Sequence, residues 1–217
     1  MKAYIFDLDG TLFESMNVWV KVDELFFQKR GISHTPDFAD TVLAMNFNEA
    51  AVYTRERYNL PETPDEIKAE WLSMAADFYA NHVEMKPGAM AFLDELVKRG
   101  EKLAVATSLP EELMAPALHK HGIYHIFHAI CTAVEVGAGK AKPDIFVLAA
   151  NKLGVKPEEC ILFDDLLAAV KSAKSIGMTV CGMLDSTSSQ HWDEIKQYAD
   201  FTLTNFEGVQ VSDFCKK

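Results

Sequence analysis

The chain has 217 residues, of which 49% are hydrophobic and 24% charged, a composition that predicts a globular protein with a sizeable core. Its formal net charge of −11 argues against binding to nucleic acid or to an anionic membrane surface. No stretch approaches the roughly eighteen consecutive apolar residues of a membrane span, and no long apolar stretch precedes the first predicted strand. We therefore expect a cytoplasmic monomer or homodimer with no signal peptide, no membrane partner and no nucleic-acid partner.

The first predicted element is a short buried strand over residues 3–6, which ends in two carboxylates. Asp7 and Asp9 stand two positions apart, a spacing at which strand side chains point to the same side. Two carboxylates so close need a cation between them or a proton on one of them, and oxygen ligands suit Mg²⁺. Gly10 then permits a tight turn or a close approach to a ligand, and Thr11 adds a hydroxyl.

Helical periodicity follows, and no strand pattern appears between Ser15 and Glu84. Thr63 and Pro64 mark one clear helix start, a capping box with proline at the first helical position. We expect an all-helical insert over residues 15–85, joined to the rest of the chain by hinges at 14–15 and 84–88. The predicted helices cover 16–30, a shorter segment after residue 36, 46–58, and 63 to about 83.

After the insert, helices alternate with short, continuously apolar strands, which is typical of a parallel sheet covered on both faces. The predicted fold class is therefore α/β, with a Rossmann-like core built from residues 1–14 and 86–217. Pro116 is expected to kink or shorten one helix. The predicted strands are 102–107, 129–131, 160–163, 179–183 and 201–203, and the predicted helices are 90–99, 110–121, 143–153, 166–176 and 190–198.

Polar residues follow four of these strands, and ligands bind at the carboxyl ends of strands in open parallel sheets. Such a set suits phosphoryl transfer, because an aspartate can form an acyl phosphate while a metal ion, a lysine and hydroxyls neutralise the phosphoryl oxygens. The residues are Asp7 and Asp9 after the first strand, Thr107 and Ser108 after the second, Lys140 after the third, and Asp164 and Asp165 after the fourth.

The order Asp-x-Asp-Gly-Thr, strand-Thr/Ser, Gly-Lys-x-x-Pro-Asp-x-Phe and strand-acid-acid resembles the haloacid dehalogenase (HAD) superfamily over nearly the whole chain. Within it, the pattern is most similar to the β-phosphoglucomutase-like phosphatases, and the helical insert looks like their type 1 cap. The resemblance implies Asp7 as the nucleophile and Asp9 as the general acid/base, which also ligates Mg²⁺ through its backbone carbonyl. It further implies that Gly10, Thr107, Ser108 and Lys140 bind the phosphoryl group with Asp7, and that Asp164 and Asp165 complete the metal site.

Two positions depart from the family pattern. The third motif is usually Lys-Pro-x-Pro, whereas here two lysines precede Pro143, and the spacing to Phe146 favours Lys140 over Lys142. After the acid pair the family usually has Ser-x-x-Gly, whereas this chain has Leu166 and Ala169, which removes a hydroxyl near the metal.

Candidate residues outside these motifs have simpler alternative explanations. Trp19, Asp23, Asn46 and Asn48 in the helical insert are candidates for substrate contact. Packing is the commoner role of a Trp on an amphipathic helix, and N-capping explains the two asparagines adequately. Four histidines cluster in sequence, but we interpret them as exposed or capping; they are His119, His121, His125 and His128. Cysteines in apolar, strand-like runs are interpreted as buried free thiols rather than disulfides or zinc ligands; the four cysteines are Cys131, Cys160, Cys181 and Cys215.

The sequence thus predicts a Mg²⁺-dependent phosphatase that acts on a small phosphorylated metabolite through an aspartyl-phosphate. A phosphomutase of the β-phosphoglucomutase type differs only in what accepts the phosphoryl group and remains an alternative. A dehalogenase is disfavoured, since Asp9 and the metal-site acids would have no role in one. The alternative of another class is a phospho-acceptor signalling or binding protein with weak or no turnover.

Overall fold

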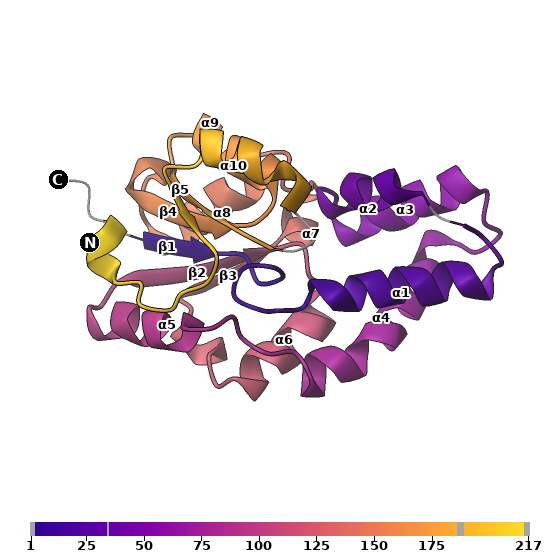
Figure 1. Cartoon of the computed structure of the whole chain (residues 1–217), viewed down its shortest axis with the longest axis horizontal. Helices are drawn as coiled ribbons and strands as arrows, with labels where there is room; N and C mark the ends of the chain where they lie inside the picture. The colour runs from indigo at the N-terminus through magenta and orange to yellow at the C-terminus, as the bar shows by residue number, and fades with distance from the viewer. Residues whose placement is uncertain (1–2, 34, 186–188, 215–217) are drawn as a thin grey trace.

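The computed structural model describes residues 3–33, 35–185 and 189–214, and its centre is a six-stranded parallel sheet with the order β3-β2-β1-β4-β5-β6 (Figure 1). This sheet confirms the predicted Rossmann-like fold, and it places β1 between β2 and β4, so that the residues following β1 lie at the middle of the carboxyl edge. The strands are β1 (Ala3–Phe6), β2 (Lys102–Thr107), β3 (Ala129–Thr132), β4 (Cys160–Asp164), β5 (Thr179–Met183) and β6 (Phe201–Leu203).

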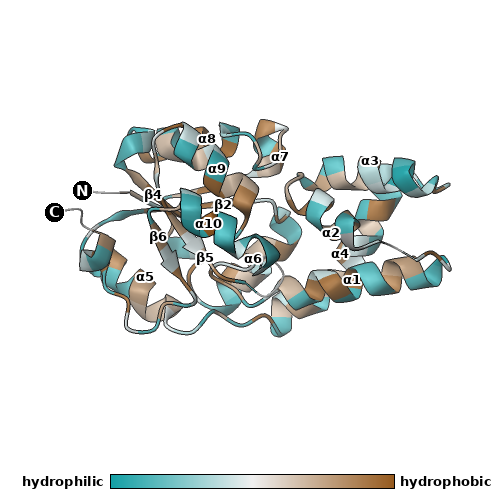
Figure 2. Ribbon diagram, turned by 45° about the horizontal axis from the view of Figure 1, so that its top comes forward, coloured by the Kyte–Doolittle hydropathy of each residue, from teal (hydrophilic) through white to brown (hydrophobic). Residues whose placement is uncertain are grey.

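Two apolar clusters cover the two faces of the sheet. Tyr4 and Phe6 of β1 belong to one cluster and Ala3 and Ile5 to the other, as the alternation of a strand requires. The helices carry both hydrophobic and hydrophilic residues (Figure 2), as expected of helices with one buried side. On the Phe6 side lie α5 (Ala89–Lys98) and α6 (Glu111–Lys120); on the other side lie α8 (Asp144–Leu153), α9 (Leu167–Ser175) and α10 (Trp192–Tyr198).

Among the described residues, the predicted helical insert forms four helices. Figure 1 shows them gathered at one end of the sheet. Asn46 and Thr63 begin two of these helices with complete capping boxes. The last of them packs along α6, which ties the helical block to the core. The helices are α1 (Met16–Lys29), α2 (Pro36–Leu43), α3 (Phe47–Tyr58) and α4 (Pro64–Asn81).

The two connections between the block and the core run side by side. The backbone N–H of Glu14 donates to the carbonyl of Glu84 at 2.9 Å, and that of Lys86 donates to the carbonyl of Leu12 at 2.8 Å. Both segments therefore leave the sheet as one hydrogen-bonded pair, which holds the block at a defined position over the carboxyl edge.

Several details depart from the sequence prediction or complete it. Pro116 does not shorten α6, which continues to Lys120. Short elements that the sequence did not predict are α7 (Ala133–Val136) and the 3₁₀ helices Tyr124–Ile126, Pro157–Glu159, Ser189–His191 and Val211–Phe214. Cys131, Cys160 and Cys181 are buried free thiols, as predicted, whereas Cys215 lies outside the described residues. Within the described ranges, no helix combines the length and the apolar character needed to cross a membrane.

Candidate active site

The structure brings most of the predicted site residues to one edge of the sheet. Asp7 directly follows β1, Thr107 is the last residue of β2, and Asp164 is the last residue of β4. Because these strands are parallel neighbours, their carboxyl ends meet at the same place. Lys140 reaches the same place from the loop between α7 and α8.

Lys140 lies between two of the carboxylates. Its Nζ is 2.7 Å from Asp7 Oδ1 and 2.8 Å from Asp164 Oδ2, and the residue is only 2% exposed. Burial alone lowers the pKa of Lys140, but the charges of Asp164 and Asp7 outweigh burial and raise it above its ordinary value. The lysine is therefore a fixed positive charge in contact with Asp7.

Asp7, Asp164 and Asp165 form a group that fits a metal ion. Carboxylate oxygens of the three lie within 4.8 Å of one another, and all three residues are buried. Burial first, and then the charges of Asp164, Asp7 and Asp185, raise the pKa of Asp165 well above its ordinary value. Burial also raises the pKa of Asp164, to about 6, against the opposing effect of Lys140. Three buried carboxylates facing one lysine leave excess negative charge, and oxygen ligands of this kind suit a hard divalent cation.

Gly10 lets the loop that follows β1 come close to the acid pair Asp164 and Asp165. Its φ is +69°, and a Cβ at this position would lie 2.5 Å from Asp165 Oδ2, so no other residue fits here without displacing Asp165. The Thr11 hydroxyl donates to Asp165 Oδ1 at the long distance of 3.5 Å. Thr11 therefore places a hydroxyl beside Asp164 and Asp165. Leu166, which stands where the family usually has a serine, supplies no hydroxyl there.

Thr107 and Ser108 present hydroxyls to the same edge. Thr107 Oγ1 accepts a hydrogen bond from the Leu109 backbone N–H at 3.1 Å, so its own proton is available to a ligand. Ser108 Oγ is buried, and among the described residues it has no hydrogen-bond partner. A buried hydroxyl without a partner is costly unless a ligand provides one.

Asp9 does not join the group of acids. Its carboxylate accepts hydrogen bonds from Ser15 Oγ at 2.5 Å, Tyr79 Oη at 2.7 Å and Trp19 Nε1 at 3.1 Å. Asp9 nevertheless lines the same pocket as Asp7, although β1 ends at Phe6 and Asp9 lies in the irregular segment beyond it.

The environment of Asp9 shifts its pKa. Burial raises it to about 6, with a further rise from Asp7, and the hydrogen bonds from Ser15, Tyr79 and Trp19 act in the opposite direction. Sequence analysis identified neither Ser15 nor Tyr79 as site residues. No local pattern marks Tyr79, since it lies on α4, 70 positions from Asp9.

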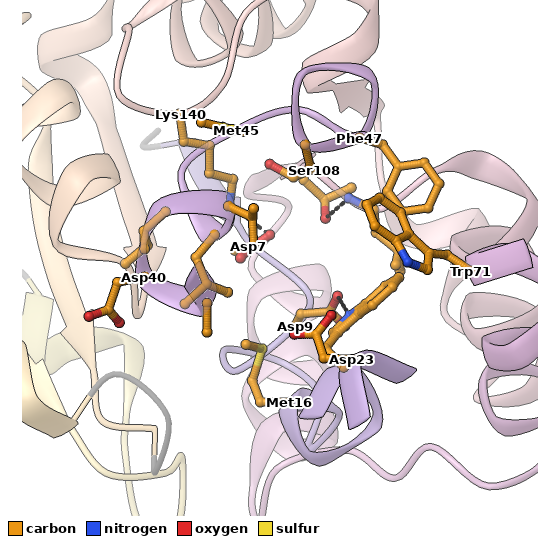
Figure 3. A pocket seen from close by; sticks show the side chains of 18 of the residues that line it. Asp7, Asp9, Met16, Asp23, Asp40, Met45, Phe47, Trp71, Ser108 and Lys140 are labelled. Carbon is orange, nitrogen blue, oxygen red and sulfur yellow. Dashed lines mark hydrogen bonds and ion pairs between the residues drawn. The ribbon is translucent and has the colours of Figure 1, made fainter. Parts of the chain in front are cut away.

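A pocket of about 200 Å³ lies between this edge and the helical block (Figure 3). We call the lining residues from the core the floor and those from the helical block the roof. The floor consists of Asp7, Asp9, Thr107, Ser108, Leu109, Pro110, Lys140, Asp165 and Leu166. The roof consists of Met16, Trp19, Val20, Asp23, Phe38, Ala39, Asp40, Val42, Leu43, Met45, Phe47, Ala50 and Trp71.

The four candidate residues for substrate contact fall into two pairs. Trp19 and Asp23 line the pocket from one side of α1. Asn46 instead accepts hydrogen bonds from the backbone of α3, and Asn48 accepts one from Lys68 Nζ; neither belongs to the roof. Much of the roof comes from residues 38–45, which sequence analysis did not single out.

The remaining candidates take structural positions. Lys142 is exposed and lies outside the pocket, unlike Lys140. Three of the histidines make local contacts: His121 Nε2 lies 2.9 Å from the carbonyl of Val83, His128 Nδ1 accepts from the Leu103 N–H, and His119 stacks on Tyr124. In the part of the chain that the structure describes, the acid group is the only cluster suited to a metal ion, and it contains no histidine.

The fold and this edge of the sheet together define an enzyme of the Rossmann-like α/β class. Comparison with known families makes the assignment specific. The family model described as haloacid dehalogenase-like hydrolase matches residues 4–183, and the chain therefore belongs to this family. The resemblance inferred from the sequence motifs is thus confirmed.

Relatives of known or assigned activity share moderate identity with the chain. It is 28% identical over 192 residues to the probable pseudouridine-5'-phosphatase of Drosophila melanogaster, covering 86% of this chain and 83% of that protein. It is 27% identical over 221 residues to hexitol phosphatase A of Escherichia coli, covering 97% of this chain and 94% of that protein.

Solved structures share the fold. A β-phosphoglucomutase from Clostridium difficile superimposes with a TM-score of 0.83 at 20% identity, covering 98% of this chain and 95% of that one. CbbY from Rhodobacter sphaeroides, in complex with phosphate, gives a TM-score of 0.84 at 21% identity, with 98% of both chains covered. These similarities concern the arrangement of the chain as a whole, the helical block included.

Proposed function

We propose that the protein is a Mg²⁺-dependent phosphatase that hydrolyses a small phosphorylated metabolite through an aspartyl-phosphate at Asp7. The observation that carries this proposal is the position of Asp7, which contacts Lys140 at 2.7 Å within a group of buried acids while Asp9 stands apart under the roof. The names of the relatives, pseudouridine-5'-phosphatase and hexitol phosphatase A, support a phosphoester substrate.

In the first step a carboxylate oxygen of Asp7 attacks phosphorus, and the bond between phosphorus and the leaving-group oxygen breaks. Asp9 transfers its proton to that leaving oxygen. With a pKa of about 6, Asp9 has a useful population of both protonation states near neutral pH. Lys140 and the hydroxyls of Thr107 and Ser108 hold the phosphoryl oxygens as negative charge moves onto them.

In the second step the Asp9 carboxylate takes a proton from a water molecule, and the water oxygen attacks the phosphorus of the aspartyl-phosphate. The bond to Asp7 breaks, and inorganic phosphate and the Asp7 carboxylate are released. The donors from Ser15, Trp19 and Tyr79 keep the Asp9 carboxylate in one orientation during both transfers.

The side chains of Asp7, Asp164 and Asp165, with the backbone carbonyl of Asp9, would hold Mg²⁺. When bound, the ion supplies positive charge that offsets the phosphoryl oxygens and the buried acids. Gly10 preserves the close approach of Asp165 that this group requires.

We further propose that residues 15–85 act as a cap and that residues 1–14 and 86–217 form the catalytic core. The paired connections at residues 12–14 and 84–86 are suited to serve as the hinge between them. Closure of the cap would exclude bulk water while Asp7 carries the phosphoryl group.

Hydrolysis of p-nitrophenyl phosphate, followed with and without Mg²⁺, tests the proposal. We expect Mg²⁺-dependent turnover that EDTA abolishes, and Asp7→Asn should lower kcat by about a thousandfold or more, because an amide is a poor nucleophile. Asp94→Asn, which removes an exposed acid from α5, is the matched control and should leave kcat unchanged. Turnover that survives exhaustive EDTA treatment, or near-normal turnover by Asp7→Asn, would contradict the mechanism.

A further inference from the structure

The roof of the pocket is mostly apolar. Its aromatic side chains contact one another. Phe47 lies edge-on to Trp71, with 5.5 Å between the ring centroids (Figure 3), and edge-on to Trp19, with 6.0 Å between the ring centroids. Among the described residues that line the pocket, Lys140 is the only cation, and it is held at the floor by Asp7 and Asp164. A leaving group under this roof therefore meets apolar surface and no positive charge.

Asp23 is a carboxylate in this apolar setting. It lies one helical turn after Trp19 on α1, and within the described parts of the chain no hydrogen bond or ion pair engages its carboxylate. Burial raises the pKa of Asp23 to about 7, because a charged carboxylate is poorly solvated among apolar side chains. A carboxylate kept among apolar side chains without a protein partner is an acceptor available to a ligand.

Trp71 is the second polar group without a partner. The residue is 5% exposed, its Nε1 is buried, and in the described part of the chain nothing accepts a hydrogen bond from it. It lines the same pocket from α4. The roof thus offers one acceptor, at the partly exposed Asp23, and one donor, at the buried Nε1 of Trp71, and among the described residues neither has a protein partner.

We propose that the substrate is a phosphate monoester whose leaving group has an aromatic or otherwise apolar body, donates a hydrogen bond to Asp23, accepts one from Trp71, and carries no second anionic group. This inference rests on the proposed phosphatase function and specifies its substrate class. A second phosphate or a carboxylate on the leaving group would face Asp23 and Asp40 with no cation in the roof to offset the repulsion.

A matched series of aryl phosphates tests the inference. Phenyl phosphates with a para 2-hydroxyethyl, 2-aminoethyl, ethyl or 2-carboxyethyl arm have similar leaving groups, because the two-carbon arm insulates the phenol oxygen from the substituent. We expect kcat/KM for the hydroxyethyl and aminoethyl esters to exceed that of the ethyl ester by about tenfold, and the carboxyethyl ester to be the poorest. Equal efficiency across the series, or a preference for the carboxyethyl ester, would overturn the inference.

Two variants assign the effect to the roof. Asp23→Asn should reduce the preference for the aminoethyl over the ethyl ester and relieve the discrimination against the carboxyethyl ester. Trp71→Phe should reduce the preference for the hydroxyethyl over the ethyl ester, since the ring remains and only the N–H is lost. Glu24→Gln, an exposed neighbour on α1, is the control and should leave every ratio unchanged. Ratios that are unchanged in both roof variants would overturn the assignment.

Binding measurements separate this inference from the proposed function. Calorimetry of the Asp7→Asn variant with the same four esters reports recognition without turnover. If the parent protein hydrolyses no ester, but the variant binds the hydroxyethyl and aminoethyl esters most tightly and the carboxyethyl ester most weakly, the phosphatase proposal fails and the proposed class of ligand stands. If all four esters are hydrolysed with equal kcat/KM and bound with equal affinity, the phosphatase proposal stands and the substrate class is wrong.

Discussion

The floor and the roof of the pocket differ in the kinds of side chain that line them. In the floor, Lys140 contacts two carboxylates at 2.7 and 2.8 Å, and each group is positioned by a strand end or an adjacent loop. The roof is a wall of apolar side chains from separate helices. Asp9 connects the core with the helical block, because it belongs to the floor while two of its three donors, Trp19 on α1 and Tyr79 on α4, come from the helical block. The helical block therefore positions a group of the proposed chemistry as well as contacting the substrate.

The largest expected effect concerns the charge balance of the floor. Lys140→Ala should lower kcat/KM by about a hundredfold to ten-thousandfold, because both the phosphoryl oxygens and two buried acids lose their cation. Lys142→Ala removes an exposed lysine two positions away and should change kcat/KM less than twofold, roughly the effect of an ordinary surface substitution. Steady-state kinetics at saturating Mg²⁺ compares them. Equal losses, or a larger loss in Lys142→Ala, would show that Lys140 is wrongly assigned as the lysine of the third motif.

The next effect concerns the close contact between the loop that carries Lys140 and the helical block. A Cβ at Gly139 would lie 2.0 Å from the carbonyl oxygen of Ala44, so Gly139→Ala must displace either the Lys140 loop or the segment after α2. A displacement of this size should lower kcat/KM by about tenfold to a hundredfold. Ala141→Ser, at an exposed position of the same loop, is the control. Parent-like kinetics in Gly139→Ala would show that this close contact is not needed for turnover.

The third effect tests whether the helical block influences proton transfer by Asp9. The hydrogen bond from Tyr79 lowers the pKa of Asp9, so Tyr79→Phe should raise that pKa. Hydrolysis of the aspartyl-phosphate needs Asp9 as a carboxylate, and its rise with pH should move to higher pH. The rate at neutral pH should fall by about threefold to tenfold.

A pH profile of single-turnover dephosphorylation measures this shift. Tyr58→Phe is the matched control, because the Tyr58 hydroxyl is buried in the helical block without a hydrogen-bond partner among the described residues and lies outside the pocket. An identical profile for Tyr79→Phe and the parent protein would show that this hydrogen bond from the helical block does not affect proton transfer by Asp9.

The smallest effect is on stability. The pKa of Asp23 is about 7 in the folded protein against an ordinary value of 3.8, so folding favours the neutral carboxyl. Below about pH 4 the Asp23 carboxyl is neutral and does not destabilise the folded state. Above about pH 7 it is charged, and its destabilising effect on the folded state is complete. Asp23→Asn should accordingly stabilise the protein at pH 8 and not at pH 4.

Because Asp23 keeps some contact with solvent, we expect a gain of about 1 kcal/mol, or roughly 2–4 °C in Tm. Thermal melts at pH 4 and pH 8 measure it, and Glu24→Gln should show no such pH dependence. A variant that is no more stable than the parent protein at pH 8 would mean that the carboxylate is satisfied in the free protein.

The sequence alone determined the α/β fold and the floor. Continuous apolar runs such as 102–107 and 160–163 predict buried parallel strands, and in the structure those two become β2 and β4. Once the strands are parallel, the residues that follow them must meet at one edge. The proximity of Asp7, Lys140 and Asp164 therefore follows from the apolar strand patterns and from the rule that the carboxyl ends of parallel strands lie at one edge of the sheet.

Only the tertiary structure decided the roof and the environment of Asp9. Tyr79 reaches Asp9 across 70 positions, and Gly139 meets Ala44 through the docking of the helical block on the core. Neither contact leaves a periodic or motif signal, because an amphipathic helix encodes which of its sides is buried but not what that side packs against. The hydrogen bonds of Asp9 depend on the tertiary structure in the same way, because Trp19 on α1 and Tyr79 on α4 reach its carboxylate only when the helical block is in place.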